Sequence, residues 1–164
     1  MKTRKQQTDD YKNYTLKESE TVRFPDDEEA AWVLDTLSYM GIKDESEGTI
    51  FIAPIVYTFY DADKHPIYVG KSINIKERFD WHRRQKYWSE VSYIGILLCD
   101  NLVWMDIVEI CEINNKMPKY NRDSNYDSVV NKYVCFCSSG LKVRVSVIDG
   151  AELVFKKKVL DSNL

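Results

Sequence analysis

Residues 50–86 read IFIAPIVYTFYDADKHPIYVGKSINIKERFDWHRRQK, and this stretch decides the predicted fold. Positions 50–60 are rich in β-branched and aromatic residues, which favour a β-strand. Pro54 lies inside that run and indicates either an edge strand or a strand that begins after it. The polar residues at 61–66 are typical of a turn, so residues 67–70 are expected to return as the second strand of a β-hairpin.

Three further elements are expected to follow the hairpin. The pattern of apolar residues predicts a helix at 74–86, a strand at 92–99 and a second, long helix at 100–115. Asp100 is expected to cap this long helix, and Pro118 to break the chain after it. The order strand, strand, helix, strand, helix predicts an α/β (α+β) core in which a three-stranded antiparallel sheet is flanked by helices.

The residues on either side of this core predict a single compact domain. Residues 1–50 read as a polar arm and a helix, because the acidic residues after Pro25 suit the positive end of a helix dipole and Gly41 ends an apolar stripe. Apolar and polar residues alternate around Asp149-Gly150, which indicates a C-terminal β-hairpin. We therefore predict an N-terminal arm and helix at 1–50, a core at 51–122 and a C-terminal β extension at 123–164.

The composition is that of an ordinary globular chain. Of the 164 residues, 44% are hydrophobic and 30% charged, which suits one domain with a core of its own. No apolar run approaches the roughly 18 residues that a membrane helix needs. The polar first residues do not resemble a secretory signal, so we expect a protein of the cytoplasm, outside the membrane, in a bacterial or phage-infected cell. The cysteines form no CxxC pair and are expected to be reduced thiols rather than a zinc site or a disulfide: Cys99, Cys111, Cys135 and Cys137.

Positive charge is concentrated in one part of the chain. The net charge of −3 argues against a protein that coats nucleic acid without discrimination. Residues 64–86 nevertheless hold seven Lys or Arg against two acidic residues, a net charge of +5 that leaves −8 for the rest of the chain. A basic face on an acidic body suits a polyanion that docks at one place, although a solvated helix face would have the same composition.

A set of polar residues recurs in order along the predicted core. The triplet Ile55-Val56-Tyr57 is followed by the triplet Tyr68-Val69-Gly70. The rest of the set is Arg78 eight residues after Gly70, His82 one helical turn later, Glu109 nine residues before Pro118, and Asn121. In this order and spacing, residues 53–121 resemble the GIY-YIG nuclease family in its compact restriction-like or phage and mobile-element form. The triplet Tyr93-Ile94-Gly95 matches the second triplet of the family name letter for letter. We nevertheless attribute it to strand packing, because no helix with an arginine follows it.

The resemblance implies a metal-dependent endonuclease that hydrolyses DNA to 5′-phosphate and 3′-hydroxyl ends. It assigns Glu109 as the only direct protein ligand of one Mg²⁺ (or Mn²⁺) ion, and a carboxylate is the hard oxygen ligand that such ions prefer. Arg78 would offer a fork of donors to the phosphate, and His82 would be an auxiliary donor or base near neutral pH. Asn121 would support the site by holding its loops together with hydrogen bonds.

The two motif tyrosines are expected on one face of neighbouring antiparallel strands. The family suggests Tyr57 as the general base that activates water, and nearby cations would favour its phenolate, so we treat Tyr57 and Lys71 as one activating unit. Tyr68 would position the water or the phosphate. DNA is the expected partner, and its candidate contacts are Lys71, Lys76, Arg83, Arg84 and Lys86.

Two other functions remain open for this sequence. A repair nuclease specific for single strands or for unusual DNA structures would use the same basic helix, with Trp81, Tyr87 or Trp88 stacking on unpaired bases or inserted into a duplex. A non-catalytic DNA-binding regulatory module could share the fold, although the complete polar set argues against it. Because each chain has one site, cutting both strands of a duplex would favour a homodimer.

Overall fold

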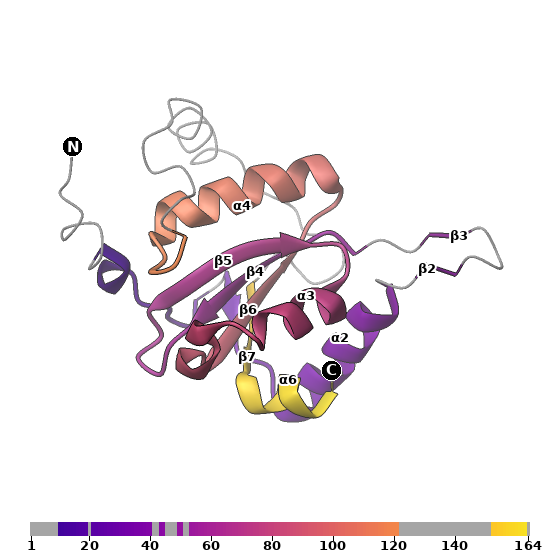
Figure 1. The fold of residues 1–164 in the computed structure, drawn as a ribbon, viewed down its shortest axis with the longest axis horizontal. Helices are drawn as coiled ribbons and strands as arrows, with labels where there is room; N and C mark the ends of the chain where they lie inside the picture. Colours follow the sequence, from indigo (N-terminus) through magenta and orange to yellow (C-terminus); the bar gives the residue numbers. More distant parts are fainter. Residues whose placement is uncertain are drawn as a thin grey trace.

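The chain forms a mixed α+β fold around a five-stranded sheet in the computed structural model (Figure 1). The structure describes residues 10–19, 21–40, 43–44, 49–50, 53–121 and 152–163. The strands lie in the order β1 (Val22–Arg23), β7 (Glu152–Lys156), β6 (Tyr93–Leu98), β4 (Ile55–Tyr60) and β5 (Pro66–Ser72). β4 is antiparallel to β5 and β6, β7 is antiparallel to β6, and β1 is parallel to β7. The three predicted strands are adjacent, but β7 and β1 extend the sheet beyond the three strands expected.

Helices cover both faces of this sheet. Figure 1 shows α4 (Leu102–Lys116) on one face and α2 (Asp27–Met40), α3 (Ile75–His82) and α6 (Lys157–Asn163) on the other. Alternate side chains of β4 enter the two layers, so that Tyr57 packs with α2 and α3 whereas Val56 packs with α4. Every residue of β4 is therefore buried. The short elements are η1 (Asp10–Asn13), η2 (Lys86–Glu90) and an antiparallel ribbon of β2 (Lys43–Asp44) and β3 (Thr49–Ile50).

Local sequence accounts for the starts of the helices. The helix predicted after Pro25 is confirmed as α2, and Asp26 Oδ1 accepts from the backbone N–H of Glu29 at 2.8 Å, which satisfies a free donor of its first turn. The predicted Asp100 cap is wrong. The side chain of the next residue, Asn101, accepts from the backbone N–H of Trp104 at 3.0 Å and caps α4 instead.

Packing decides where the helix of the motif ends. It is predicted to reach Lys86, but α3 stops at His82 and the 3-10 turn η2 follows. The bend lets Tyr87 stack its ring on Tyr68 while Trp88 becomes buried in the core. Because these partners belong to distant parts of the chain, helical propensity carries no information about the bend.

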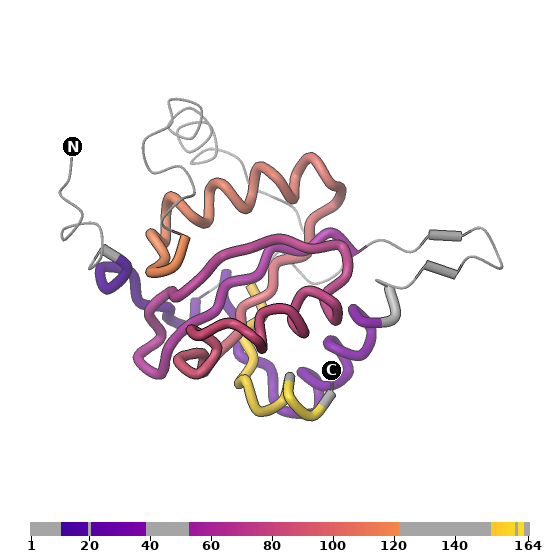
Figure 2. Tube along the Cα trace, viewed as in Figure 1, coloured from indigo at the N-terminus to yellow at the C-terminus, as the bar shows by residue number. Residues whose placement is uncertain are grey.

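The ends of the core are predicted less well than its centre. The strand expected at 50–60 begins at Ile55, immediately after Pro54. The turn at Asp149-Gly150 lies in 122–151, outside the described residues. The β extension is confirmed at β7 but is wrong at its end, where residues 157–163 form α6. Val159 of α6 joins the core cluster that α2 lines, and Figure 2 shows these two helices, from opposite ends of the chain, side by side.

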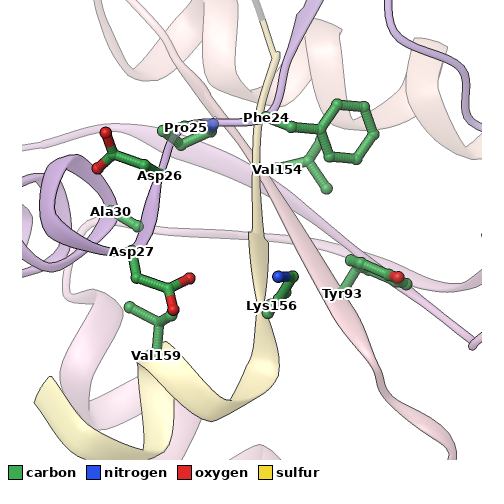
Figure 3. A pocket seen from close by; sticks show the side chains of 9 residues that line it. All are labelled: Phe24, Pro25, Asp26, Asp27, Ala30, Tyr93, Val154, Lys156 and Val159. Carbon is green, nitrogen blue, oxygen red and sulfur yellow. The ribbon is translucent and has the colours of Figure 1, made fainter.

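A cavity of about 390 Å³ lies where the start of α2 approaches β7 (Figure 3). Its lining residues are Phe24, Pro25, Asp26, Asp27, Ala30, Tyr93, Val154, Lys156 and Val159. Asp27 is also paired with Lys158 of α6, at 2.8 Å between Oδ2 and Nζ. The residues of the predicted site do not line this cavity.

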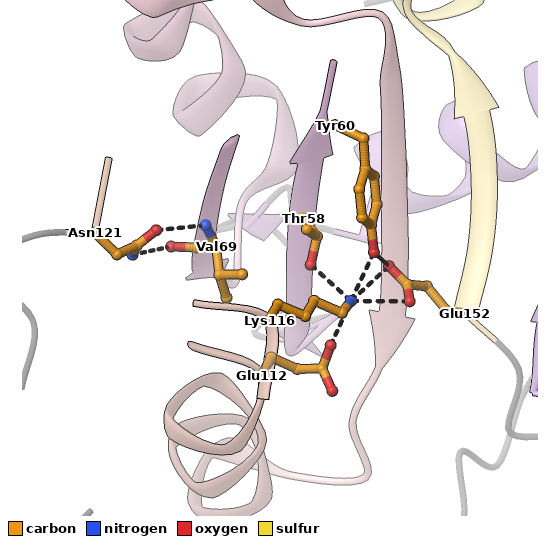
Figure 4. Close-up of polar contacts among 7 residues, drawn as sticks. All are labelled: Thr58, Tyr60, Val69, Glu112, Lys116, Asn121 and Glu152. Atoms are coloured by element: carbon orange, nitrogen blue, oxygen red, sulfur yellow. Dashed lines mark hydrogen bonds and ion pairs between the residues drawn. The ribbon is translucent and has the colours of Figure 1, made fainter. Parts of the chain in front are cut away.

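A buried ionic cluster ties α4 to β4 and β7 (Figure 4). Lys116 is 3% exposed, and its ammonium lies 2.5 Å from Glu112 Oε2, 2.9 Å from Glu152 Oε2, 2.7 Å from Tyr60 Oη and 3.1 Å from Thr58 Oγ1. Burial alone would lower the pKa of Lys116, but the two carboxylates outweigh it and hold the pKa well above its usual value. The charged lysine therefore fixes the last turn of the helix that carries Glu109.

Cys99 and Cys111 are buried, and burial raises the pKa of Cys99 to about 11. Cys99 is therefore protonated at neutral pH, which suits a reduced cysteine that serves packing. Cys135 and Cys137 lie outside the described residues. Among the helices that the structure describes, none is both long enough and apolar enough to cross a bilayer.

Candidate active site

Four residues of the motif meet on the face of the sheet that α3 covers. Tyr57 comes from β4, Tyr68 from β5, and Arg78 and His82 from one face of α3. Arg78 donates from Nε to Tyr57 Oη at 2.9 Å and from Nη2 to Tyr68 Oη at 3.3 Å. Tyr57 Oη is also hydrogen-bonded to Nε2 of His82, at 2.6 Å. The fold thus joins side chains that are up to 25 positions apart in the sequence.

Gly70 makes this approach of the two phenols possible. It lies opposite Tyr57 in the β4–β5 register. A Cβ atom at position 70 would lie 2.5 Å from Tyr57 Oη and 2.8 Å from Tyr68 Cε1, closer than real Cβ contacts come. The glycine of the second triplet therefore sets the spacing between the tyrosines, and any side chain there would displace them.

Tyr57 is too enclosed to act as the predicted general base. Its side chain is 0% exposed, and burial raises the pKa of its phenol far above the usual value, which Arg78 offsets only in part. Lys71, which was expected to assist, lies opposite Val56 in the register and therefore projects from the other face of the sheet. The interpretation of Tyr57 and Lys71 as one activating unit is wrong. Tyr57 instead accepts a hydrogen bond from Arg78 and orients its guanidinium.

His82 does not titrate near neutral pH. It is 0% exposed, and burial together with the charge of Arg78 lowers its pKa to about 3. The neutral ring bridges two phenols, because Nε2 bonds to Tyr57 Oη and Nδ1 bonds to Tyr87 Oη at 2.5 Å. His82 is therefore not the base or donor near neutral pH that was expected. Its ring instead holds Tyr57 and Tyr87 in position. The sequence links Tyr87 with base stacking but not with His82, since their contact depends on the bend after α3.

A stack of tyrosine rings continues this network. Tyr68 and Tyr87 stack with ring centroids 5.6 Å apart, and Tyr87 and Tyr120 follow at 5.2 Å. Tyr120 donates to Glu90, which is also paired with Lys119 at 2.6 Å. Burial raises the pKa of both Tyr68 and Tyr87, so these phenols stay protonated at neutral pH. They can act as hydrogen-bond donors and as stacking surfaces.

Glu109 lies on the opposite face of the sheet, on α4. Its Oε2 is 2.8 Å from Nζ of Lys71, which is also 2.8 Å from Oδ1 of Asp106. Burial acts to lower the pKa of Lys71, but its bonds to the two carboxylates outweigh burial and raise that pKa, so the lysine stays charged. Asp106 was not singled out from the sequence, although its position three residues before Glu109 places both on one helical face.

The two groups of residues flank β5, the last strand of the sheet. Asn121 fastens this strand: its Oδ1 accepts from the N–H of Val69 at 2.8 Å and its Nδ2 donates to the carbonyl of Val69 at 2.7 Å (Figure 4). Burial is the main reason for the raised pKa of Tyr68, and the charge of Glu109 raises it further. Tyr68 and Lys71 project from opposite faces of the edge strand β5, so a ligand beside this strand could meet side chains from both faces.

An opening of about 270 Å³ lies where β5 passes into α3. Its lining residues are Ser72, Ile73, Asn74, Glu77, Arg78 and Trp81. Arg78 is the motif residue that reaches the opening, and its bonds to the phenols use only part of the donor fork of a guanidinium. The remaining N–H groups can bind an anion that enters here.

The basic residues predicted to contact DNA differ in their surroundings. Lys76, Arg84 and Lys86 are exposed, as a DNA contact requires. Arg83 is half-buried and contacts Asp80 at 2.5 Å and Asp161 at 3.8 Å. Lys71 is held by Asp106 and Glu109. Three of the five predicted cations are therefore exposed, whereas Arg83 and Lys71 are paired with carboxylates.

Glu109 and Asp106 fit a hard cation, because the two carboxylates already share one cationic group, the ammonium of Lys71. Within the described ranges, no group of three or more His, Cys, Asp or Glu side chains is placed to hold a metal. An ion at this pair would therefore take its other ligands from water and from the substrate, which suits Mg²⁺. Comparison with known proteins identifies no relative: no family model, curated protein or solved structure matches this chain.

Proposed function

We propose that this protein is a metal-dependent DNA endonuclease that hydrolyses phosphodiester bonds to 5′-phosphate and 3′-hydroxyl ends, with one Mg²⁺ or Mn²⁺ ion per site. One observation carries the proposal: two phenols hold the Arg78 guanidinium at the border of an opening while part of its donor fork stays available. A phosphate diester is a ligand that such a fork fits. The resemblance of the motif to the GIY-YIG nucleases suggests the reaction, since a fold class alone would not.

The partners of Arg78 suit a residue that binds phosphate in a transition state. Phenols are neutral, so Tyr57 and Tyr68 orient the guanidinium without cancelling its charge. The bonds from His82 to Tyr57 and Tyr87 hold this arrangement before the substrate arrives. Donors that are already aimed at developing negative charge need no rearrangement during the reaction, and this accounts for much of their catalytic effect.

Tyr68 is the motif phenol that can meet the attacking water. It is half-buried, whereas Tyr57 is enclosed. Its oxygen accepts a hydrogen bond from Arg78, and its own O–H remains a donor. Because burial raises its pKa, Tyr68 stays a phenol at neutral pH and would orient the water rather than remove its proton. Tyr68 therefore keeps the positioning role expected for it. It also replaces Tyr57 as the motif tyrosine that contacts the water.

Glu109 would hold the ion, with Asp106 as the neighbouring carboxylate. Bound there, the ion would supply Lewis acidity toward the phosphate and lower the pKa of a water molecule. Lys71 would then be repelled from the carboxylates of Asp106 and Glu109. Its ammonium would become available to the DNA backbone, which restores to Lys71 the DNA contact predicted from the sequence.

The proposal is tested by incubating supercoiled plasmid and single-stranded DNA with the protein in Mg²⁺, Mn²⁺ or EDTA. Glu109→Gln and Asp106→Asn form a matched pair, since each converts one carboxylate on Lys71 into an amide. We expect Glu109→Gln to lower cleavage by at least about a hundredfold, a typical cost of removing a group that stabilises transition-state charge. Asp106→Asn should lower it by less than about tenfold, because an exposed neighbouring charge acts mainly through a screened field.

Calorimetric titration with Mn²⁺ separates loss of the metal from other defects. Glu109→Gln should weaken Mn²⁺ binding more than Asp106→Asn does. Full metal-dependent cleavage by Glu109→Gln, or wild-type cleavage in EDTA, would contradict the proposal. DNA binding by the wild-type protein without any cleavage would favour the regulatory module. Cytoplasmic location and dimer formation on duplex DNA stay predictions.

A further inference from the structure

The opening beside Arg78 has a wall that phosphate binding does not explain. Trp81 is 46% exposed and Ile73 is 44% exposed, which makes them two of the few large apolar side chains that the described residues leave in contact with solvent. Both line the opening, Ile73 from the turn after β5 and Trp81 from α3. Apolar surface at the border of a polar site is typical of a place that a ligand covers.

Trp81 is held in place before any ligand arrives. The guanidinium carbon of Arg78 lies 4.8 Å from the centroid of the indole, and the ring of His82 meets it edge-on at 4.9 Å. An indole restrained in this way loses little conformational freedom when it stacks on a ligand. The same contact also keeps Trp81 next to the cation that would bind the phosphate.

The carboxylate of Glu77 argues against a second phosphate in the rest of the opening. A second phosphate would meet the carboxylate of Glu77 and be repelled, whereas a group with N–H donors would be attracted. Asn74 Oδ1 accepts from the N–H of Glu77 at 3.2 Å, which orients the first turn of α3 and the side chain that follows it. The ligand that fits an exposed indole, an aliphatic side chain and a carboxylate acceptor is flat and aromatic and carries N–H groups.

We propose that this opening is a nucleobase pocket, in which one unpaired base of the strand being cut stacks on Trp81 while a phosphate of the same strand binds Arg78. This inference rests on the proposed nuclease function and names its substrate class. A base inside a paired duplex does not expose its face to a side chain, so the substrate is single-stranded DNA or DNA with a locally unpaired base. Glu77 accepts a hydrogen bond from the exocyclic amino group of adenine, cytosine or guanine, whereas an unpaired thymine offers only its ring N3–H.

The test measures binding in EDTA, so that it does not depend on cleavage. Fluorescence anisotropy gives the Kd of labelled oligonucleotides that are single-stranded, fully paired, or paired except for one central unpaired base. Trp81→Ala should weaken binding to the first and third of these by about tenfold or more, the effect of losing one base–aromatic stack. Trp81→Phe should restore binding to within about threefold of wild type, because phenylalanine keeps a ring for stacking.

Trp32→Ala is the matched control, since Trp32 is also exposed, at 66%, but lies on α2 away from the lining residues. It should leave every Kd unchanged. The affinity for fully paired DNA should fall by less than about threefold in Trp81→Ala. Glu77→Gln should narrow the preference of the protein for oligo(dA) or oligo(dC) over oligo(dT).

A second measurement keeps the wild-type protein and changes the DNA. An abasic nucleotide in place of the single unpaired base should weaken binding about as much as Trp81→Ala does, and the two changes together should cost little more than either alone. Equal effects of Trp81→Ala and Trp32→Ala, or equal losses on paired and unpaired DNA, would overturn the pocket.

Cleavage assays on the same proteins distinguish this failure from failure of the proposed function. If the protein cleaves DNA but Trp81→Ala leaves its DNA binding unchanged, the pocket is overturned and the nuclease function stands. Binding that depends on Trp81 without any metal-dependent cleavage would overturn the nuclease and keep the pocket as a single-strand binding site. A wild-type protein that binds none of the oligonucleotides would overturn both.

Discussion

The cations on the two faces of the sheet are held in opposite ways. Lys116 is buried, and its ammonium is bonded to the carboxylates of Glu112 and Glu152. Arg78 is half-buried, and its bonds go to the neutral phenols of Tyr57 and Tyr68. The protein therefore balances the charge of Lys116 internally, whereas it orients the charge of Arg78 without neutralising it. The difference separates a cation that holds the fold together from one that is ready for an anionic ligand.

Two similar triplets support these two clusters. In Tyr68-Val69-Gly70 the glycine makes room for Tyr57, and a Cβ there would lie 2.5 Å from the Tyr57 oxygen. In Tyr93-Ile94-Gly95 the glycine makes room for Glu152, whose Oε1 would lie 2.1 Å from an added Cβ. Both glycines face β4, but they open toward different layers. The literal triplet therefore belongs to the ionic cluster and not to the candidate site, in agreement with its attribution to strand packing.

Removing the ammonium of Lys116 should have the largest effect on stability. Lys116→Met would leave the buried carboxylate of Glu152 and the partly buried carboxylate of Glu112 without their cation, so we expect a loss of about 3–5 kcal/mol in the free energy of unfolding. Arg78→Met should cost only about 1–2 kcal/mol, because it removes two hydrogen bonds to neutral partners. Urea denaturation monitored by circular dichroism measures both values, with Lys76→Met as an exposed control. Equal losses for the Lys116 and Arg78 variants would remove the distinction between the clusters.

Exchange of the two glycines for alanine sharpens the comparison with a smaller effect. Each substitution forces a Cβ into occupied space, for which overpacking typically costs about 1–3 kcal/mol. Gly95→Ala should lower stability but leave cleavage per folded molecule near wild type, since it disturbs Glu152. Gly70→Ala should lower the cleavage rate by more than its loss of stability explains, since it displaces the phenols that hold Arg78. Parallel denaturation and cleavage assays decide this, and a cleavage defect confined to Gly95→Ala would reverse the assignment.

The stability of the protein should also depend on pH through His82. The folded pKa of His82 is about 3, below the value of about 6.5 expected in the unfolded chain. The unfolded state therefore binds more protons between these values, so stability is complete above about pH 6.5 and falls as the pH drops toward 3. Below pH 6 the slope from this group should approach about 1.4 kcal/mol per pH unit.

Urea denaturation at pH 5, 6, 7 and 8 measures that slope, and the narrow range keeps most carboxylates ionised. His82→Gln should lose the decline between pH 7 and 5, whereas His65→Gln serves as the histidine control. The same slope in wild type and His82→Gln would show that His82 is not held neutral by the fold. The expected absence of a His82 titration near pH 7 also means that cleavage should not depend on it there.

The order of the central elements could be read from local patterns, whereas the set of motif residues was predicted from the resemblance to a family. Residues 55–60 and 66–72 pair as a hairpin because β-branched and aromatic residues flank a polar turn. Arg78 and His82 share a helix face because they are four positions apart. The roles of Tyr57 and His82 could not be read in this way, since burial sets their pKa values and burial depends on the whole fold.

The sequence by itself determined which residues share one face of each strand or helix, because side chains return to the same face every two residues in a strand and every 3.6 residues in a helix. Only the tertiary structure decided that Lys71 faces α4 rather than Tyr57, that Tyr87 completes the network of His82, and that Glu152 returns beside Lys116. These contacts join residues from separate elements, and one of them spans 36 positions. Their geometry follows from how the layers pack around the sheet, and no local spacing encodes that packing.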